Sequence, residues 1–313
     1  MRAIVFERNG GPDVLEFKDA PDPVPGEGEA LVDVEAVGVN YRDVYEREGQ
    51  SYGSTPPAII GVEGAGTISE TGERVAWVAV AGSYAERVAA PRDKLVPIPD
   101  GVSTEVAAAA LLQGMTAHYL VADSYQIEAG DWVLVHAAAG GVGLLLTQLA
   151  KLRGGRVIAT TSTDEKAALA REAGADHTIG YDSFAARVRE ITDGEGAAAV
   201  YDGIGRTTFL HGFGALRALG RMILYGAAGG QPDPLEVQML ASWGSLYVQR
   251  PTLMTYTRTP ELLRERAAAL FELVASGKLH VRIGARYPLM DARRAQEDLE
   301  ARSTTGKLLL LTK

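Results

Sequence analysis

The sequence contains no cysteine among its 313 residues. Disulfide bonds are therefore excluded, and so are thiolate metal ligands and a cysteine nucleophile. A structural zinc site of the common cysteine-rich kinds cannot form either. The five histidines show no paired metal-ligand spacing such as i, i+4; they stand at positions 118, 136, 177, 211 and 280. We expect a protein that binds no metal.

Long apolar runs and an excess of positive charge are also missing. No apolar segment reaches the roughly 20 residues that a membrane-spanning helix needs. The first residues, M-R-A-I-V-F-E-R, lack the apolar centre of a signal peptide. The formal net charge is −9 at pH 7, whereas binding to nucleic acid or to an anionic membrane requires clustered Lys and Arg. We expect a cytoplasmic protein with neither kind of partner.

The chain is long enough for two domains, at about 150 residues per domain. Its first third contains short segments rich in Val, Ile and Ala and bounded by Gly and Pro, which indicates β-strands. These strands are predicted at residues 2–7, 30–39, 66–69, 74–80 and 84–89. A helix is predicted over residues 103–122, with a break near Gly114.

From residue 131 onward, near-continuous apolar strands alternate with helices. Six strands are predicted, at residues 132–139, 156–162, 177–181, 197–202, 221–226 and 245–249. The helices between them are predicted at residues 140–152, 164–173, 183–192 and 207–219. This alternation predicts an α/β fold with a doubly wound parallel sheet that is covered on both faces.

The last sixty or so residues return to a different pattern. Helices are predicted at 260–276 and near 291–301, followed by an apolar strand at 307–312. A final strand of this kind suits a return to the sheet of the first domain. We therefore predict a discontinuous first domain with the α/β unit inserted into it.

Residues 138–143, A-A-G-G-V-G, match the pattern G-x-G-x-x-G with Ala138 at its first position. They lie between a predicted strand and a predicted helix, the context that this pattern needs to indicate a dinucleotide site. Gly140 and Gly141 would allow a tight turn near a pyrophosphate, and Gly143 would let the helix pack on the strand. The alternative is a plain glycine-rich turn.

The end of the second strand of this unit indicates which dinucleotide is bound. An NAD site places an acid about 20 residues after the glycine pattern, but Thr160, Thr161 and Ser162 occupy this strand end. Hydroxyl groups can donate to a 2′-phosphate, and Lys166 would supply a positive charge on the next helix. Tyr181 would add a phenolic donor. These residues favour NADP(H), unless Lys166 is simply a solvated helix residue.

Residues 61–75, G-V-E-G-A-G-T-I-S-E-T-G-E-R-V, carry the spacing G-x-E-x-x-G-x5-G-x-x-V. This segment resembles the signature of the medium-chain dehydrogenase/reductase superfamily. In the zinc alcohol dehydrogenases of that group a zinc-binding His precedes the Glu, whereas Val62 stands there in this chain. Asn40 stands where those enzymes carry a zinc-binding Cys. The resemblance implies that no catalytic zinc is bound, and we expect Glu63 to hold structure through hydrogen bonds.

Further segments resemble the zinc-independent quinone oxidoreductases, the zeta-crystallin-like branch of that superfamily. They are residues 38–49 (G-V-N-Y-R-D-V-Y-E-R-E-G), 81–86, 136–143, 200–205 and 244–251. The resemblance implies a GroES-like, β-rich catalytic domain formed by residues 1–113 and 251–313. It implies a six-stranded Rossmann domain formed by residues 114–250. It also implies a homodimer at the Rossmann edge strand, to which the apolar segment 235–248 leads.

The same resemblance assigns an NADPH site residue by residue. Beside the nicotinamide and its ribose it places Asn40, Tyr41, Asp43, Tyr45 and Thr116. At the pyrophosphate turn it places Gly141 and Val142, next to Gly140, and at the 2′-phosphate it places Ser162, Lys166 and Tyr181. The remaining contacts are Gly203, Ile204, Tyr225, Gly226, Ala227, Ala228, Arg250, Pro251, Thr252, Leu253 and Gly306.

We hypothesise that Asn40 and Tyr45 position the carbonyl group of an acceptor and donate hydrogen bonds to it. Tyr52 would flank the pocket, and Arg250 would be the electrostatic partner. The alternatives are that Asn40 is a turn residue bonded to its own backbone and that Tyr45 is a core aromatic. Asp202, at the end of a strand, is interpreted as the cap of the next helix rather than as a ligand-binding residue.

The resemblance implies an NADPH-dependent quinone oxidoreductase that transfers a hydride or electrons without metal or flavin. An NADPH-dependent reductase of enones or alkenals is an alternative on the same scaffold. A second alternative, from another class, is an NADPH-binding protein that is not catalytic.

Overall fold

The computed structural model describes residues 1–50 and 54–313, and it divides into two compact units. One unit is formed by Met1–Met115 together with Thr257–Lys313, and the other by Thr116–Tyr256. The division predicted from the sequence, with an inserted segment 114–250, differs from this one by a few residues at each boundary. Within the described residues, no helix is both long enough and apolar enough to cross a membrane.

The first unit is built on a seven-stranded sheet with the order β15-β16-β3-β5-β6-β8, and β7 pairs with β3. The strands are β3 (Glu29–Val39), β5 (Glu63–Ile68), β6 (Arg74–Val78), β7 (Arg87–Pro91), β8 (Leu95–Pro97), β15 (Ile283–Pro288) and β16 (Lys307–Leu311). A smaller sheet contains β1 (Arg2–Phe6), β2 (Leu15–Asp19) and β4 (Ala58–Ile59). Because β16 pairs antiparallel with β3, the predicted return of the last strand to the first sheet is confirmed.

Among the described residues, four α-helices belong wholly or mainly to the first unit: α1 (Tyr41–Arg47), α2 (Thr104–Tyr119), α9 (Pro260–Ala275) and α10 (Ala292–Glu300). The predicted break near Gly114 is wrong, because α2 continues through this residue. A Cβ atom on Gly114 would lie 2.6 Å from Cδ1 of Leu270 on α9. The glycine therefore makes room for a neighbouring helix and does not interrupt its own.

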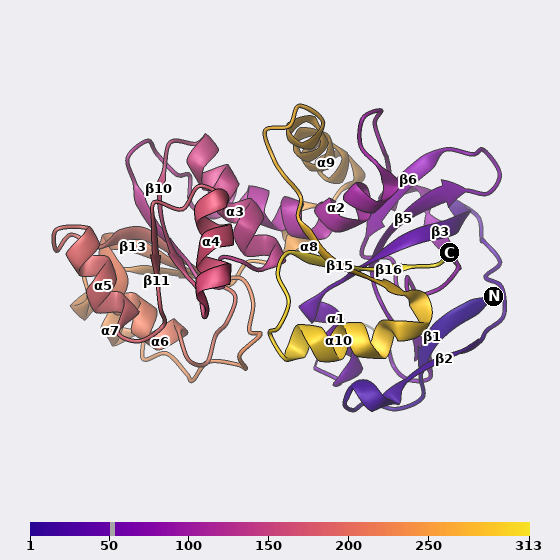
Figure 1. Ribbon diagram of the computed structural model, residues 1–313, viewed down its shortest axis with the longest axis horizontal. Helices are drawn as coiled ribbons and strands as arrows, with labels where there is room; N and C mark the ends of the chain where they lie inside the picture. Colours follow the sequence, from indigo (N-terminus) through magenta and orange to yellow (C-terminus); the bar gives the residue numbers. More distant parts are fainter. Residues whose placement is uncertain (51–53) are drawn as a thin grey trace. The chain divides into compact units, whose positions relative to one another are not determined.

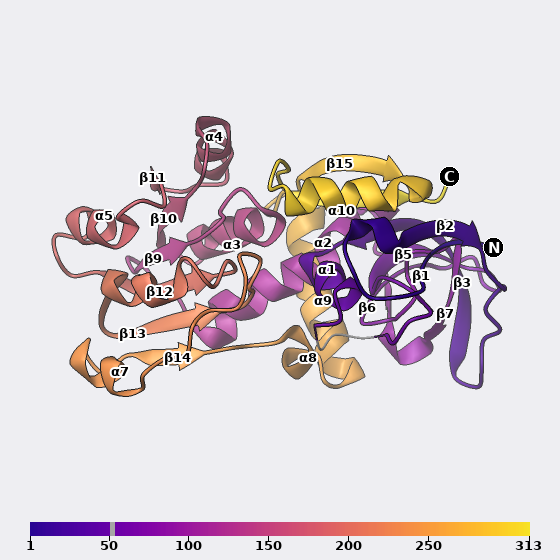
Figure 2. The same ribbon diagram turned by 90° about the horizontal axis from the view of Figure 1, so that it is seen from below.

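The second unit is a parallel six-stranded sheet with the order β11-β10-β9-β12-β13-β14, which Figure 2 shows from top to bottom. The strands are β9 (Trp132–Val135), β10 (Arg156–Thr160), β11 (His177–Ile179), β12 (Ala197–Asp202), β13 (Leu216–Leu224) and β14 (Tyr247–Gln249). Helices α3 (Gly141–Leu152) and α4 (Asp164–Glu172) lie on one face, and α5 (Phe184–Ile191) and α6 (Phe209–Gly212) lie on the other (Figure 1). The predicted doubly wound sheet is confirmed.

The helix predicted over 207–219 is too long. The α-helical part, α6, ends at Gly212, a 3₁₀ turn covers Phe213–Ala215, and β13 already begins at Leu216. Leu216 is fully buried and pairs with Ala197 of β12. Pairing with the neighbouring strand therefore overrides the weak helix propensity of a segment that contains Gly212 and Gly214.

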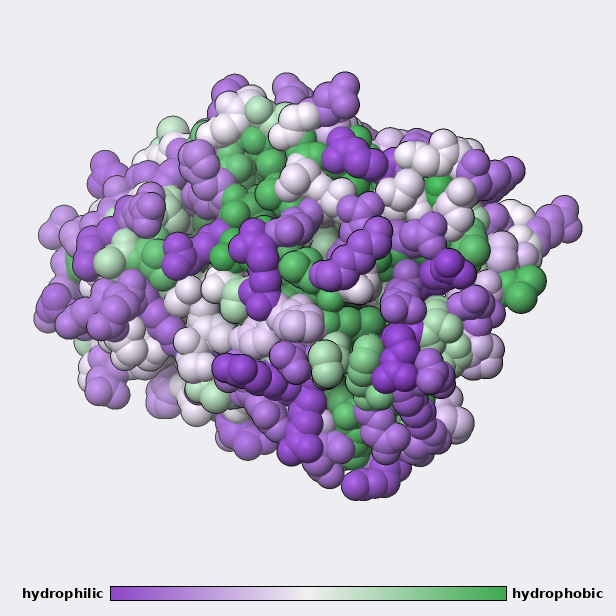
Figure 3. Space-filling view, turned by 45° about the vertical axis from the view of Figure 1, so that its right-hand side comes forward, coloured by the Kyte–Doolittle hydropathy of each residue, from purple (hydrophilic) through white to green (hydrophobic). Residues whose placement is uncertain are grey.

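Each unit has its own apolar core. In the first unit Trp77, Phe6 and Ile60 are fully buried and belong to one apolar cluster. In the second unit Phe213 and Leu134 belong to the core beside the parallel sheet. The outer face shown in Figure 3 is mainly hydrophilic, with smaller hydrophobic areas between the charged side chains.

Candidate active site

The glycine-rich turn of the second unit joins β9 to α3, so the strand–turn–helix context predicted for it is confirmed. Gly140 is the N-cap of α3, and the helix begins at Gly141. A Cβ atom on Gly143 would lie only 2.4 Å from the carbonyl oxygen of Ala137. This close approach packs the helix against the strand end. It leaves the N–H groups of the first helical turn pointing toward the place where an anion would bind.

Two of the groups predicted for a 2′-phosphate, those of Ser162 and Lys166, lie together at the tip of β10. Nζ of Lys166, on α4, donates to Oγ of Ser162 at 3.3 Å. The hydroxyl of Tyr181 accepts a hydrogen bond of 3.2 Å from the N–H of Ala137 in the glycine-rich turn. Thr160 differs from these residues because it is fully buried.

A buried histidine lies beneath this tip. Nδ1 of His136 and Oγ1 of Thr160 are 2.9 Å apart, and this contact joins the ends of β9 and β10. Burial lowers the pKa of His136 from 6.5 to about 4. His136 is therefore neutral at neutral pH and brings no positive charge to a phosphate, which leaves this task to Lys166.

The loops that follow β12 and β13 lie against each other. The N–H of Ala228 donates to the carbonyl oxygen of Gly203 at 3.0 Å, and the N–H of Gly229 donates to that of Ile204 at 2.7 Å. A Cβ atom on Gly226 would lie 2.9 Å from the carbonyl oxygen of Gly203. The structure thus brings together two groups of predicted cofactor contacts, 203–204 and 225–228.

Asp202 fastens the first of these loops. Its carboxylate accepts from the N–H groups of Ile204 at 2.7 Å and Gly205 at 3.1 Å, and from Oγ1 of Thr208 at 2.8 Å. The residue is fully buried. The predicted helix cap is therefore wrong: the N-cap of α6 is Thr208, and Asp202 instead holds the turn that precedes this helix.

The other predicted contacts lie in several segments. Arg250 is exposed, and its Nη1 donates to the carbonyl oxygen of Pro251 at 3.2 Å. Thr252 precedes α8 (Leu253–Tyr256). Thr116 is buried on α2, and Gly306 precedes β16 with a φ of 62°. Tyr52 lies outside the described residues.

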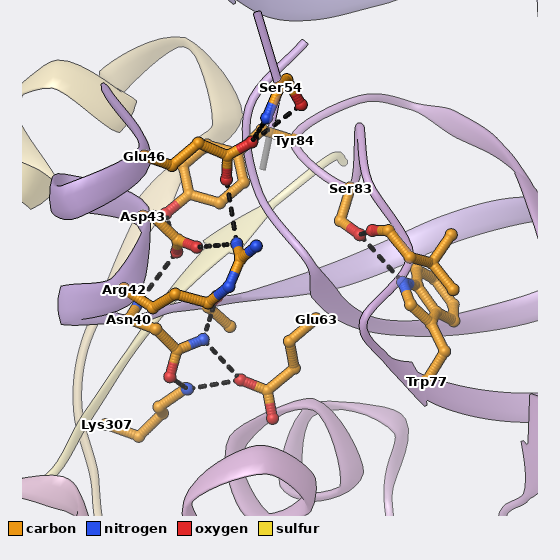
Figure 4. Close-up of polar contacts among 12 residues, drawn as sticks. Asn40, Arg42, Asp43, Glu46, Ser54, Glu63, Trp77, Ser83, Tyr84 and Lys307 are labelled. Atoms are coloured by element: carbon orange, nitrogen blue, oxygen red, sulfur yellow. Dashed lines mark hydrogen bonds and ion pairs between the residues drawn. The ribbon is translucent and has the colours of Figure 1, made fainter. Parts of the chain in front are cut away.

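A group of buried polar side chains occupies the first unit where β3, α1, β5 and β16 meet (Figure 4). Nζ of Lys307 lies 2.6 Å from Oε2 of Glu63, and both side chains are buried. Asn40 contacts both charges: its Nδ2 donates to Oε2 of Glu63 at 2.8 Å, and its Oδ1 accepts from Lys307 at 2.7 Å. We call Asn40, Glu63 and Lys307 the buried triad.

Glu63 is held on both of its oxygens. Its second oxygen, Oε1, accepts from the N–H of Leu112 on α2 at 2.6 Å. Gly38 provides the space, because a Cβ atom there would lie 2.4 Å from Oε2 of Glu63. The expectation that Glu63 holds structure through hydrogen bonds is confirmed.

The amide of Asn40 is already fully engaged within the protein. Besides its bond to Glu63, Nδ2 donates to the carbonyl oxygen of Gly38 at 3.1 Å. An amide nitrogen has two hydrogens, so both are used. Donation from Asn40 to an acceptor carbonyl, as hypothesised from the sequence, would require one of these bonds to be given up.

Asp43 lies directly beside the buried triad. One carboxylate oxygen, Oδ2, accepts from the backbone N–H of Asn40 and from the hydroxyl of Tyr84, each at 2.9 Å. The other oxygen has no hydrogen-bond partner among the described residues, and Nη1 of Arg42 is 3.8 Å away. Burial raises the pKa of Asp43 from 3.8 to about 7.

Two predicted contacts, Tyr41 and Tyr45, lie on α1 with ring centroids 5.4 Å apart. Tyr45 is 9% exposed, whereas Tyr41 is half-buried. Burial raises the pKa of Tyr41 above its ordinary value. The phenol of Tyr41 therefore stays protonated at neutral pH and remains able to donate a hydrogen bond.

Val62 and Asn40, which stand where the zinc alcohol dehydrogenases carry zinc ligands, contribute no metal-binding atoms of the usual kind. Val62 is buried, and Asn40 belongs to the triad. In the described part of the chain, no three His, Cys, Asp or Glu side chains gather in a way that could hold a metal ion.

Sequence reasoning missed Lys307. The residue opens the strand K-L-L-L-L, a position where a lysine is ordinarily interpreted as a solvated strand end. The available signal was a lone lysine at the start of an otherwise apolar strand, combined with a carboxylate, Glu63, for which the sequence offered no partner.

Comparison with known proteins agrees with this architecture. Residues 26–100 match the family model described as an alcohol dehydrogenase GroES-like domain, and residues 141–273 match that of a zinc-binding dehydrogenase. A quinone oxidoreductase of Pseudomonas aeruginosa is 40% identical, with 99% of each chain covered. A 2-haloacrylate reductase of a Burkholderia species is 36% identical, with 99% of this chain and 98% of that protein covered.

Among solved structures, a mycobacterial protein in complex with NADPH matches with a TM-score of 0.97 and 48% identity. The match covers 99% of this chain and 100% of that one. The full-length similarity and the two matched domains together are decisive: the chain belongs to the quinone oxidoreductase family of the medium-chain dehydrogenases/reductases.

Proposed function

We propose that this protein is an NADPH-dependent quinone oxidoreductase. The observation that carries the cofactor assignment is the Lys166–Ser162 contact of 3.3 Å at the tip of β10, where an NAD site would carry an acid. The solved mycobacterial relative in complex with NADPH supports the same assignment. The quinone assignment is supported by the Pseudomonas aeruginosa relative, which matches over nearly all of both chains.

The proposed site residues have two functions: to bind NADPH and to orient it relative to the acceptor. The turn at 140–143 would bind the pyrophosphate through backbone N–H groups, and Lys166 would neutralise the 2′-phosphate. When bound, NADPH supplies the hydride. The protein then has to orient the two reactants and exclude water.

We propose that the remaining predicted residues contact the cofactor or the acceptor, as the family resemblance implies. Tyr45 is the proposed donor to the acceptor carbonyl, because the hydrogens of Asn40 are already used. Asn40 would then act from within the buried triad, and Asp43 from beside it. The proposed role of Tyr52 is still to flank the acceptor pocket. The proposed role of Arg250 is still that of the electrostatic partner.

A reductase of activated alkenes is the second candidate. The observation in its favour is the similarity to the 2-haloacrylate reductase, a protein whose name describes an acceptor with an electron-poor double bond. Both reactions need an acceptor that is already electrophilic, because the described residues offer no cluster of metal ligands that could polarise it.

Purified protein with NADPH, a quinone panel and an alkenal panel will decide between these candidates. We expect the absorbance of NADPH to fall rapidly with quinones and slowly with alkenals. The reverse order would favour the alkene reductase. Tight NADPH binding with no turnover on either panel would favour a binding protein that is not catalytic.

We also propose a homodimer that forms along β14, the edge strand of the parallel sheet. Tyr247 and Val248 on this strand are 53% and 39% exposed. An exposed apolar sheet edge favours pairing with a second copy. A location in the cytoplasm, expected from the sequence, remains a prediction that cell fractionation can test.

A further inference from the structure

The buried triad has an arrangement that fixes one orientation of an amide. Lys307 carries only positive charge and donors, and Glu63 carries only negative charge and acceptors. Oδ1 of Asn40 lies against the ammonium at 2.7 Å, and Nδ2 lies against the carboxylate at 2.8 Å. A flipped amide would place its hydrogens against Lys307 and its oxygen against Glu63. Both contacts would then become repulsive.

The triad also anchors the start of α1. Asn40 is the N-cap of this helix, and its backbone N–H donates to Asp43 on the first turn. The same residue is tied through its side chain to β5 by Glu63 and to β16 by Lys307. The position of α1, which carries Tyr41 and Tyr45, therefore depends on a charge pair located outside the helix.

The pair is buried too deeply to be an ordinary surface salt bridge. The side chains of Lys307 and Glu63 are 1% and 0% exposed. Replacing a buried ion pair by well-packed uncharged groups is often neutral for stability, whereas removing one partner is strongly destabilising. Stability alone therefore does not explain why a charged pair stands here.

We propose that Lys307 is a positioning residue for hydride transfer. Its ammonium, paired with Glu63, holds the Asn40 amide in one orientation and fixes the start of α1, so that the tyrosines proposed to contact the nicotinamide and the acceptor are held in place. This inference rests on the proposed quinone oxidoreductase function. Lys307 itself touches neither reactant in this proposal and acts through Asn40.

The first test uses the double variant Glu63→Gln/Lys307→Met, which leaves no unpaired charge. The amide oxygen that Glu63→Gln introduces can still accept from the N–H of Leu112. We expect a melting temperature and a Kd for NADPH close to those of the wild type, but a fall in kcat with a quinone of about tenfold or more. A single Lys307→Arg variant keeps the charge and should recover part of kcat. Lys94→Met, at a part-buried lysine of the same unit that donates to the carbonyl oxygen of Ala79, is the matched control.

The second test asks whether Lys307 acts through Asn40. In an Asn40→Ala background, the double substitution should cause little further loss of kcat, because the residue to be positioned is gone. The proposal would be overturned if the fall in kcat of the combined variant equalled the product of the falls caused by Asn40→Ala and by the double substitution. It would also be overturned if the folded double variant kept the wild-type kcat. If the single variant Lys307→Arg fails to fold, the double variant still provides the measurement.

A readout that needs no turnover separates this proposal from the proposed function. The side-chain amide of Asn40 can be assigned by nuclear magnetic resonance as the signal missing from Asn40→Ala. We expect its two hydrogens to be protected from exchange in the wild type and to lose protection in the double variant. Unchanged protection would overturn the positioning role. If the wild type turned over no quinone, the proposed function would fail while this measurement would still decide the role of Lys307.

Discussion

Lys307 and Glu63 are separated by 244 positions in the chain, yet their side chains form a buried ion pair of 2.6 Å. The pair brings the last strand of the chain to a carboxylate near the start of the signature segment 61–75. The carboxylate that seemed isolated in the sequence thus has a cation, and this cation belongs to the protein itself.

Lys166 should set the preference for NADPH over NADH. Because its ammonium stands beside Ser162 where the 2′-phosphate is proposed to bind, Lys166→Ala should raise the Kd for NADPH about tenfold or more. This follows from a charge-assisted hydrogen bond of roughly 1.5–3 kcal/mol. The Kd for NADH should not change. Fluorescence titration with both cofactors measures the effect, and Lys278→Ala, at an exposed lysine of the other unit, is the control. An equal rise for the two cofactors would show that Lys166 does not contact the 2′-phosphate.

Gly143 should not tolerate a side chain. A Cβ atom at this position would lie 2.4 Å from the carbonyl oxygen of Ala137 and 2.7 Å from Cα of Ala138. Gly143→Ala should therefore push α3 away from β9, weaken NADPH binding and lower the melting temperature. Gly214→Ala is the matched control in the same unit, because its Cβ atom would make only an ordinary contact of 3.5 Å with Ala185. NADPH binding at wild-type strength in Gly143→Ala would contradict the proposed pyrophosphate site.

Asp43 should make the protein less stable as the pH rises. Its pKa is about 7 in the folded state against an ordinary value of 3.8. Between these values the unfolded chain has lost the proton while the folded chain keeps it. The free energy of unfolding therefore decreases from about pH 4 to about pH 7, by roughly 4 kcal/mol in total.

Asp43→Asn removes this titration and keeps an oxygen that can accept from Asn40 and Tyr84. Relative to the wild type, the variant should gain stability steadily as the pH is raised from about 4 to about 8. Urea unfolding at a series of pH values measures this difference. Asp93→Asn, at an exposed aspartate of the same unit, should show no such trend. A difference that is independent of pH would mean that Asp43 does not titrate in this range.

The edge strand β14 should hold the proposed dimer together. Light scattering should give the wild type a mass twice that of its 33.2 kDa chain, and Val248→Asp should reduce it to that of a single chain. The reason is that an aspartate at the edge would place a charge in the apolar contact. Val24→Asp is the control, because Val24 is 87% exposed and lies in the other unit. A monomeric wild type would refute the proposal, and a dimeric Val248→Asp would place the interface elsewhere.

The sequence predicted the second unit well because its central strands, β9, β10 and β12, are almost wholly buried. Continuous apolar runs separated by helices have one usual arrangement, so the parallel sheet and the glycine-rich turn could be read locally. Ser162 and Lys166 were also predictable, because they are four residues apart at a strand end and the start of the following helix. The errors at 207–219 and at Gly114 arose where a distant segment decided the local structure: Ala197 pairs with Leu216, and Leu270 packs against Gly114.

The sequence by itself determined the fold class, the dinucleotide turn and the absence of zinc-ligand residue types at positions 40 and 62. It also presented Glu63 as a carboxylate without a partner. Only the tertiary structure decided what that carboxylate binds, because β16 must first pair with β3 before Lys307 reaches Glu63. The pairing of β5 with β3 places Glu63 where it accepts one hydrogen of Asn40, and β16 brings Lys307 to the oxygen of the same amide. These contacts could not be derived from the identity of Asn40 or from its spacing. The fold determines which group lies beside a buried charge. Because an unpaired buried charge is strongly destabilising, the folded state must provide a partner for it.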